Sequence, residues 1–110
     1  MIILLRIIFA IILLAMLAVT SWASNIVALW KIPGEVIRHP WFIATLFDTY
    51  FAFITFWLWV AYKERSWPAR LGWLFTILAL GNIAMAIYML LQLFRLPANA
   101  KLDQLLLRAR

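Results

Sequence analysis

Three long apolar runs, separated by two short polar links, dominate the hydrophobic pattern of this chain. About 20 apolar residues are enough for a helix to cross a bilayer, so each run can form a transmembrane helix. A short basic segment with leucines on one face follows, typical of a helix lying on a membrane surface. The pattern predicts one all-α membrane domain, residues 1–110, with helices at about 2–30, 41–62 and 71–96, short links at 31–40 and 63–70, and an amphipathic surface helix at about 100–108.

The first run has features of both a signal peptide and a retained helix. Arg6, a core rich in leucine and isoleucine, and the small residues Ser21 and Ala23 are typical of a cleavable signal. The apolar character continues beyond that point to Trp30, which favours a retained transmembrane helix. Residues suited to a helix–helix contact recur at alternating spacings of four and three: Arg6, Ala10, Leu14, Leu17, Ser21, Ser24 and Ala28.

The second run contains one acid, Asp48, within its apolar sequence. At about 100° per residue, Asp48 shares a small, polar stripe with Thr45, whereas bulky side chains such as Phe47 and Phe51 lie on the other side. We expect the polar stripe to face the other helices and the aromatic face to meet lipid. An ionisable group at this depth costs about 2.5–3.5 kcal/mol on insertion scales, so Asp48 is a candidate site.

The third run carries two amides, Asn82 and Gln92, which we expect to hydrogen-bond to neighbouring helices. With three spans, the N-terminus and link 63–70 lie on one side of the membrane, and link 31–40 and the tail lie on the other. The tail contributes Lys101, Arg108 and Arg110 to its side. The basic residues are then divided between both sides, and the positive-inside rule favours a cytoplasmic tail only slightly.

Composition supports lipid as the solvent of this chain. Hydrophobic residues make up 68% and charged residues 13%, against about half and a quarter in an average globular domain. The charged residues behind the net charge of +6 lie almost wholly between and after the apolar runs, which favours anionic lipid headgroups over nucleic acid as their partner. There is no cysteine, which excludes disulfides, thiolate metal sites and thiol catalysis.

Two stretches resemble a known family: DTYFAFITFWLWVAYKERSW, residues 48–67, and LGNIAMAIYMLLQLFRL, residues 80–96. The chain is similar there to a family of small, uncharacterised membrane proteins of bacteria and photosynthetic eukaryotes, catalogued only as a domain of unknown function. The likeness covers roughly residues 1–96. It implies a multi-span membrane protein, and it assigns no activity and no role to any residue.

Two interpretations of Asp48 are open. As a functional residue, Asp48 would relay protons, hold a cation or bind a polar headgroup. As a structural residue, it would be hydrogen-bonded by Thr45, by Ser21 or Ser24, and by Gln92. The candidate ligand-binding or polar-core set is therefore Asp48, Thr45, Asn82, Gln92, Ser21 and Ser24.

Other chemistry has little support in the sequence. The one histidine, His39, could ligate a pigment metal, but a histidine beside a proline at the start of a helix is more often an interfacial hydrogen-bonding group. No metal-binding spacing, Ser/His/Asp arrangement or phosphate-binding glycine loop is present. We expect no intrinsic cofactor, and lipid, quinone or pigment as the candidate molecules at the helix surfaces.

These observations favour a small, non-catalytic accessory or scaffolding subunit. It would pack against a larger membrane complex, such as a respiratory or photosynthetic one, or against copies of itself. The expected location is a bacterial inner (cytoplasmic) membrane, with membrane lipids and protein as partners and no nucleic acid. The alternative is a small-molecule-binding membrane protein or transporter with a polar pocket around Asp48, Asn82 and Gln92.

Overall fold

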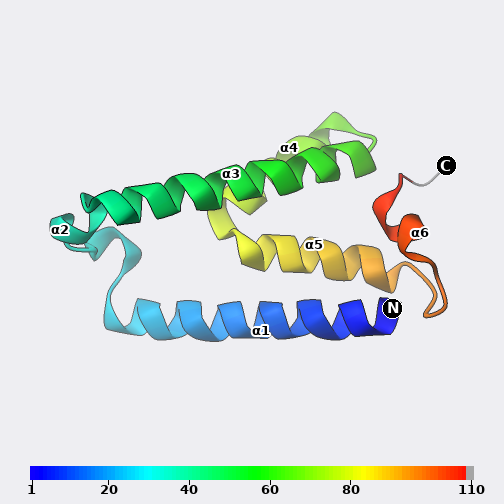
Figure 1. Cartoon of the computed structure of the whole chain (residues 1–110), viewed down its shortest axis with the longest axis horizontal. Coiled ribbons are helices and arrows are strands. Elements are labelled where there is room, and N and C mark those ends of the chain that lie inside the picture. Colours follow the sequence, from blue (N-terminus) through cyan, green and yellow to red (C-terminus); the bar gives the residue numbers. More distant parts are fainter. Residues whose placement is uncertain (109–110) are drawn as a thin grey trace.

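The computed structural model describes residues 1–108, so Arg110 lies outside the described residues. This part of the chain is helical and contains no strand, which confirms the predicted all-α class. The elements in order are α1 (Ile2–Ile26), the 3₁₀ turn η1 (Leu29–Lys31), α2 (Gly34–Ile37), α3 (Pro40–Lys63), α4 (Trp67–Leu80), α5 (Asn82–Phe94) and α6 (Leu102–Leu106) (Figure 1).

Two helices, α1 and α3, are long and apolar enough to cross a membrane. The prediction of a third such helix at 71–96 is wrong, because that segment forms two shorter apolar helices, α4 with 14 residues and α5 with 13. At about 1.5 Å per residue, each measures about 20 Å, less than the roughly 30 Å hydrocarbon core of a bilayer.

Gly81 divides the predicted third helix. Its backbone has φ 59° and ψ −125°, a conformation that is open essentially to glycine alone. The ring of Phe53 on α3 covers this turn so closely that a Cβ atom at Gly81 would lie 2.6 Å from the Phe53 Cζ atom. The turn therefore requires glycine both for its backbone conformation and for the contact with α3.

The chain reverses direction at Gly81. Helix α4 begins next to the end of α3 and runs back along it, and α5 then returns to the end of the molecule where α4 began (Figure 1). Both ends of the described chain lie at that end of the molecule, which also holds link 64–66. The prediction that the N-terminus and the tail lie at opposite ends is therefore wrong. The break at Gly81 brings the tail back to the end where the N-terminus lies.

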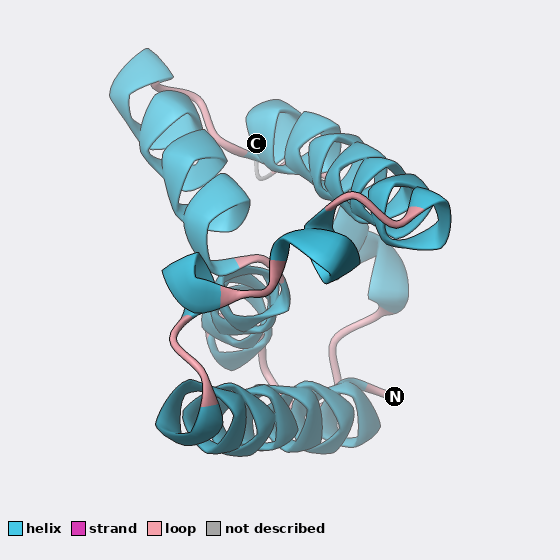
Figure 2. Ribbon diagram, turned by 90° about the vertical axis from the view of Figure 1, so that its left-hand side faces the viewer, coloured by secondary structure: helices cyan, strands magenta, loops and turns pink. Residues whose placement is uncertain are grey.

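Helix α5 is the centre of the packing. It lies between α1 on one side and the pair α3 and α4 on the other (Figures 1 and 2). One buried cluster joins Phe53 and Val60 of α3 and Ile77 of α4 to Tyr88 of α5. A second joins α5 to the start of α1 and to α6: Ile2, Met89, Leu93 and Leu105. Both clusters lie between the Gly81 turn and the end that holds the termini.

Beyond the Gly81 turn, α1 and α3 continue without a helix between them, and they do not pack along one another (Figure 2). The predicted contact seam of α1 is therefore partly covered at Arg6 and Ala10 and exposed at Leu14, Leu17, Ser21 and Ser24. This half of the molecule leaves long stretches of both helices open to their surroundings.

The two faces of α3 differ from the prediction. The small and polar stripe is mostly exposed, at Thr45, Asp48, Ala52 and Thr55, whereas Phe53 and Val60 are buried. Aromatic rings bury more surface than threonines do, and α4 and α5 pack on the face of α3 that carries Phe53 and Val60. The outward position of Phe47 and Phe51 agrees with the prediction.

The tail helix is shorter than predicted. Helix α6 covers five residues, and its Leu105 is buried against Ile2 and Leu93, whereas Leu102 and Leu106 are exposed. The tail therefore closes the end of the helix bundle and does not form a separate amphipathic helix.

The Gly81 turn can be tested with two glycine substitutions. We expect Gly81→Ala to lower the free energy of unfolding by about 1–3 kcal/mol or more, because it adds backbone strain and a clash with Phe53. Gly72→Ala is the matched control, since nothing lies within 4 Å of its added Cβ atom, and it should raise stability by about 0.5–1 kcal/mol. Thermal unfolding of the detergent-solubilised chain, followed by circular dichroism, measures both. Equal changes in the free energy of unfolding for Gly81→Ala and Gly72→Ala would show that the turn at Gly81 does not require glycine.

Candidate functional site

Asp48 lies on the exposed surface of α3. It is eight residues after Pro40, or about 12 Å along the helix at 1.5 Å per residue. Within residues 1–108, its carboxylate makes no hydrogen bond to any other group. Phe53, five residues later, points into the core, so the Asp48 side chain points roughly 140° away from the core. Asp48 thus presents a carboxyl group outward from an apolar helix.

The hydroxyl groups expected around Asp48 do not bond to it. Thr45 donates to the Trp41 carbonyl oxygen, 2.8 Å away within the same helix, and Thr55 donates to the Phe51 carbonyl oxygen at 2.9 Å. Ser21 and Ser24 are exposed on α1, which does not pack along α3. The carboxylate of Asp48 and the hydroxyls of Ser21 and Ser24 therefore remain available to a group from outside the chain.

The structure separates the two amides from Asp48. Asn82 is exposed at the first position of α5, next to the Gly81 turn and on the core side of α3. Gln92 lies further along α5, partly buried near the end that holds the termini. Counting along the helices, Asp48 and Gln92 are roughly 20 Å apart on the long axis. One copy of the chain does not gather Asp48, Asn82 and Gln92 into a pocket.

His39 caps a helix. Its Nδ1 atom accepts a hydrogen bond from the Trp41 backbone N–H at 3.2 Å, and Pro40 occupies the first position of α3. This pairing satisfies a backbone donor that α3 itself leaves free. Within the described residues, no group of three or more His, Asp or Glu residues is placed to hold a metal ion.

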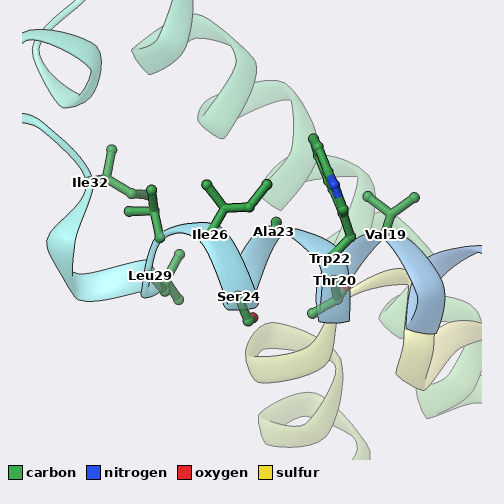
Figure 3. A pocket seen from close by; sticks show the side chains of 9 residues that line it. Val19, Thr20, Trp22, Ala23, Ser24, Ile26, Leu29 and Ile32 are labelled. Atoms are coloured by element: carbon green, nitrogen blue, oxygen red, sulfur yellow. The ribbon is translucent and has the colours of Figure 1, made fainter.

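A hollow of about 480 Å³ lies at the far end of α1. The side chains that line it come from the last turns of α1 and the following link, and Figure 3 shows Trp22 and Ile26 extending to one side of α1 and Ser24 to the other. The lining is mainly apolar and Asp48 takes no part in it. Its chemistry suits a hydrocarbon chain better than a polar substrate.

A network of cations that the sequence did not predict lies at the end that holds the termini. Arg6 of α1 donates from Nη2 to the carbonyl oxygens of Leu93 at 3.1 Å and Leu96 at 2.7 Å, and its guanidinium lies 4.8 Å from the centre of the Phe94 ring. Leu93 is in the last turn of α5, where its carbonyl oxygen also accepts from the Leu96 backbone N–H at 3.2 Å, and Leu96 follows the helix. Arg6 therefore closes the C-terminal end of α5 and complements the negative end of its dipole.

The end of α3 is tied to the tail in the same way. Lys63 donates from Nζ to the carbonyl oxygens of Leu105 at 2.7 Å and Leu107 at 2.9 Å. The indole N–H of Trp59 donates to the Leu106 carbonyl oxygen at 2.9 Å. Arg108 returns a hydrogen bond from Nε to the Tyr62 carbonyl oxygen. These bonds hold α6 against α3 and explain why Leu105 is buried.

Tyr88 connects this end to the core. Its ring is fully buried among Phe56, Trp59 and Trp73, each in an edge-to-face arrangement with centroids 4.9–6.2 Å away. Its hydroxyl donates to Glu64 Oε1 at 3.2 Å. The geometry is that of an anchored aromatic core whose one polar group reaches a carboxylate.

One sequence signal could have revealed part of this network. Lys63 and Arg95 lie at the C-terminal ends of α3 and α5, where lysine or arginine commonly bonds to free carbonyls. Arg6 and Arg70 lie near the starts of α1 and α4, where this rule does not apply. The pattern does not say which carbonyls are within reach. The partners of Arg6 are 87 and 90 residues away in the sequence.

The arrangement offers two surfaces of different chemistry. One is the open half of the molecule, with the outward Asp48 carboxyl and free hydroxyls on apolar helices. The other is the cationic end, where most of the described basic side chains gather. The first can receive a hydrogen-bond donor or a cation, and the second can receive anions.

The chain belongs to a family described as proteins of unknown function (DUF1475), whose model matches residues 1–110. This confirms the resemblance to a domain of unknown function and extends it over the tail. A search of curated proteins and a search of solved structures gave no match.

The role of Arg6 can be tested against a second arginine at the same helix end. We expect Arg6→Met to lower the free energy of unfolding by about 1–3 kcal/mol, because two hydrogen bonds from a charged group are lost. Arg95→Met is the control, since Arg95 is exposed and donates no side-chain hydrogen bond within residues 1–108; it should change stability by about 0.5 kcal/mol or less. Chemical unfolding in detergent measures the stability of both variants. Equal losses of stability in Arg6→Met and Arg95→Met would refute the role of Arg6 as a cap of α5.

Proposed function

We propose that the protein is an integral membrane protein with two spans, α1 and α3, that serves as a non-catalytic accessory subunit of a larger membrane complex. The open half of the molecule is its docking surface. The occupant is a transmembrane helix of a partner subunit that brings a hydrogen-bond donor or a cation to Asp48.

The observation that carries this proposal is the exposed, unpaired carboxyl of Asp48 on a helix of spanning length. A charged side chain in the middle of a bilayer is costly, and such groups almost always face other protein or a water-filled cavity. The chain itself supplies no partner to Asp48 among the described residues. A partner from another subunit would remove that cost.

The shape of the docking surface supports the same conclusion. Thr45, Ala52 and Thr55 share the exposed stripe with Asp48, and small residues allow two helix backbones to approach closely in lipid. The Gly81 turn withdraws α4 and α5 from this half, so α1 and α3 have no neighbour there. A partner helix packed on this stripe would cover Asp48 on the side of α3 that faces away from the core.

The two short helices also suit a membrane setting. Apolar helices of about 10–14 residues occur both as buried core helices and as re-entrant segments of membrane proteins. A break in the helix at membrane depth is tolerated only where protein or a water-filled cavity surrounds it, and Gly81 is buried beneath Phe53.

Substitution of Asp48 tests the proposal. We expect wild-type protein, extracted in mild detergent, to co-purify with a stoichiometric membrane complex. Asp48→Asn should weaken that association by about ten-fold or more, the equivalent of about 1.4 kcal/mol, while leaving the melting temperature of the isolated subunit unchanged. Quantitative co-purification and thermal unfolding measure the two effects.

Glu35→Gln provides the control, because it removes another exposed carboxylate in the α2 segment and changes the net charge by the same amount. It should leave the complex intact. A free, monodisperse wild-type oligomer with saturable binding of a small molecule would contradict the accessory role, and loss of stability alone in Asp48→Asn would make Asp48 structural.

A further inference from the structure

The basic side chains are concentrated at one end of the molecule. Among residues 1–108, nine are lysine or arginine, and only Lys31 and Arg38 lie at the end with α2. The other seven are at the end that holds the termini: Arg6, Lys63, Arg65, Arg70, Arg95, Lys101 and Arg108. This end carries two acids, Glu64 and Asp103, so its positive charge is largely uncompensated.

The Gly81 turn creates this concentration. In a chain with three spans, Arg95, Lys101 and Arg108 would lie at the opposite end from Arg6 and link 64–66. Because α5 returns to the end where α4 began, these three cations join the other four. The concentration of cations at one end is therefore a consequence of the fold. Three crossing helices would divide the same cations between the two ends.

Four of the seven cations already have partners inside the chain. Arg6, Lys63, Arg70 and Arg108 donate to backbone carbonyl oxygens, and each lies 4.8–5.9 Å from the centre of an aromatic ring. The remaining three, Arg65, Arg95 and Lys101, are exposed, and their side chains donate no hydrogen bond within the described residues. These three are free to bind an external anion.

Exposed apolar side chains lie at the same end of the molecule as the free cations. Trp67 is 63% exposed, Phe94 66% and Leu107 56%, all at the same end of the molecule. Tryptophan rings and the stems of lysine and arginine are typical of the headgroup region of a bilayer, where apolar and charged groups must both be satisfied. A soluble polyanion would leave the apolar side chains exposed to water, so a lipid surface fits this end better.

We infer that the end formed by Arg65, Arg95 and Lys101 binds the headgroups of anionic phospholipids. Guanidinium and ammonium groups form charge-assisted hydrogen bonds to phosphate oxygens, and a basic residue near an anionic bilayer contributes about 1 kcal/mol, which corresponds to about five-fold in binding. The inference rests on the proposed membrane placement of α1 and α3.

A lipid titration tests this inference. Phosphatidylglycerol and phosphatidylcholine are titrated separately into the purified full-length protein in neutral detergent, and bound lipid is counted by native mass spectrometry. We expect phosphatidylglycerol to bind more tightly. The triple variant Arg65→Gln/Arg95→Gln/Lys101→Gln should lose on the order of a hundred-fold in affinity for phosphatidylglycerol, from about five-fold per cation.

The double variant Lys31→Gln/Arg38→Gln is the control, because it removes cations from the other end, and it should keep the wild-type affinity. Equal affinity of the wild type for both lipids, or an equal loss in both variants, would overturn the inference. Unchanged melting temperatures in detergent exclude unfolding as the cause. Extraction of cell membranes with alkaline carbonate separates the two proposals: release of the chain would refute membrane placement itself.

Discussion

The rest of the structure depends on a backbone turn that only glycine adopts readily. Gly81 has φ 59°, and Phe53 of α3 covers the place where a Cβ atom would lie. This turn ends α4 before it can cross a bilayer and sends α5 back between α1 and α3. It decides which half of the molecule has a packed core, which half is left open, and which cations share an end.

Cations bonded to carbonyl groups hold the returned segment in place. Arg6 closes α5, and Lys63 joins α3 to α6 and to Leu107, which follows it. Free carbonyls at a helix end need donors, and water is scarce beside apolar helices. Lysine and arginine supply both the hydrogen bonds and a charge that complements the helix dipole. The same end still presents Arg65, Arg95 and Lys101 outward.

The sequence was sufficient to predict the helical class, the two long helices and the outward position of Phe47 on α3. The third helix was expected to begin at about residue 71, whereas α4 begins at Trp67. The sequence could not predict the turn, because Gly72 lies inside a helix whereas Gly81 ends one. What distinguishes Gly81 from Gly72 is its contact with Phe53. Asp48 was identified as a candidate from its residue type, but its outward direction depends on which face α4 and α5 cover. The Arg6 cap joins residues about 90 positions apart, beyond the reach of local patterns.

The central claim is that the chain turns back at Gly81, and single cysteines in this cysteine-free protein test it most directly. Glu35→Cys, Ser66→Cys and Asn99→Cys are labelled with a membrane-impermeant maleimide in intact cells and after permeabilisation. The basic end should be cytoplasmic by the positive-inside rule. The account therefore predicts labelling of Glu35→Cys in intact cells, and of Ser66→Cys and Asn99→Cys only after permeabilisation. Labelling of Asn99→Cys together with Glu35→Cys, and opposite to Ser66→Cys, would show a third crossing and contradict the account.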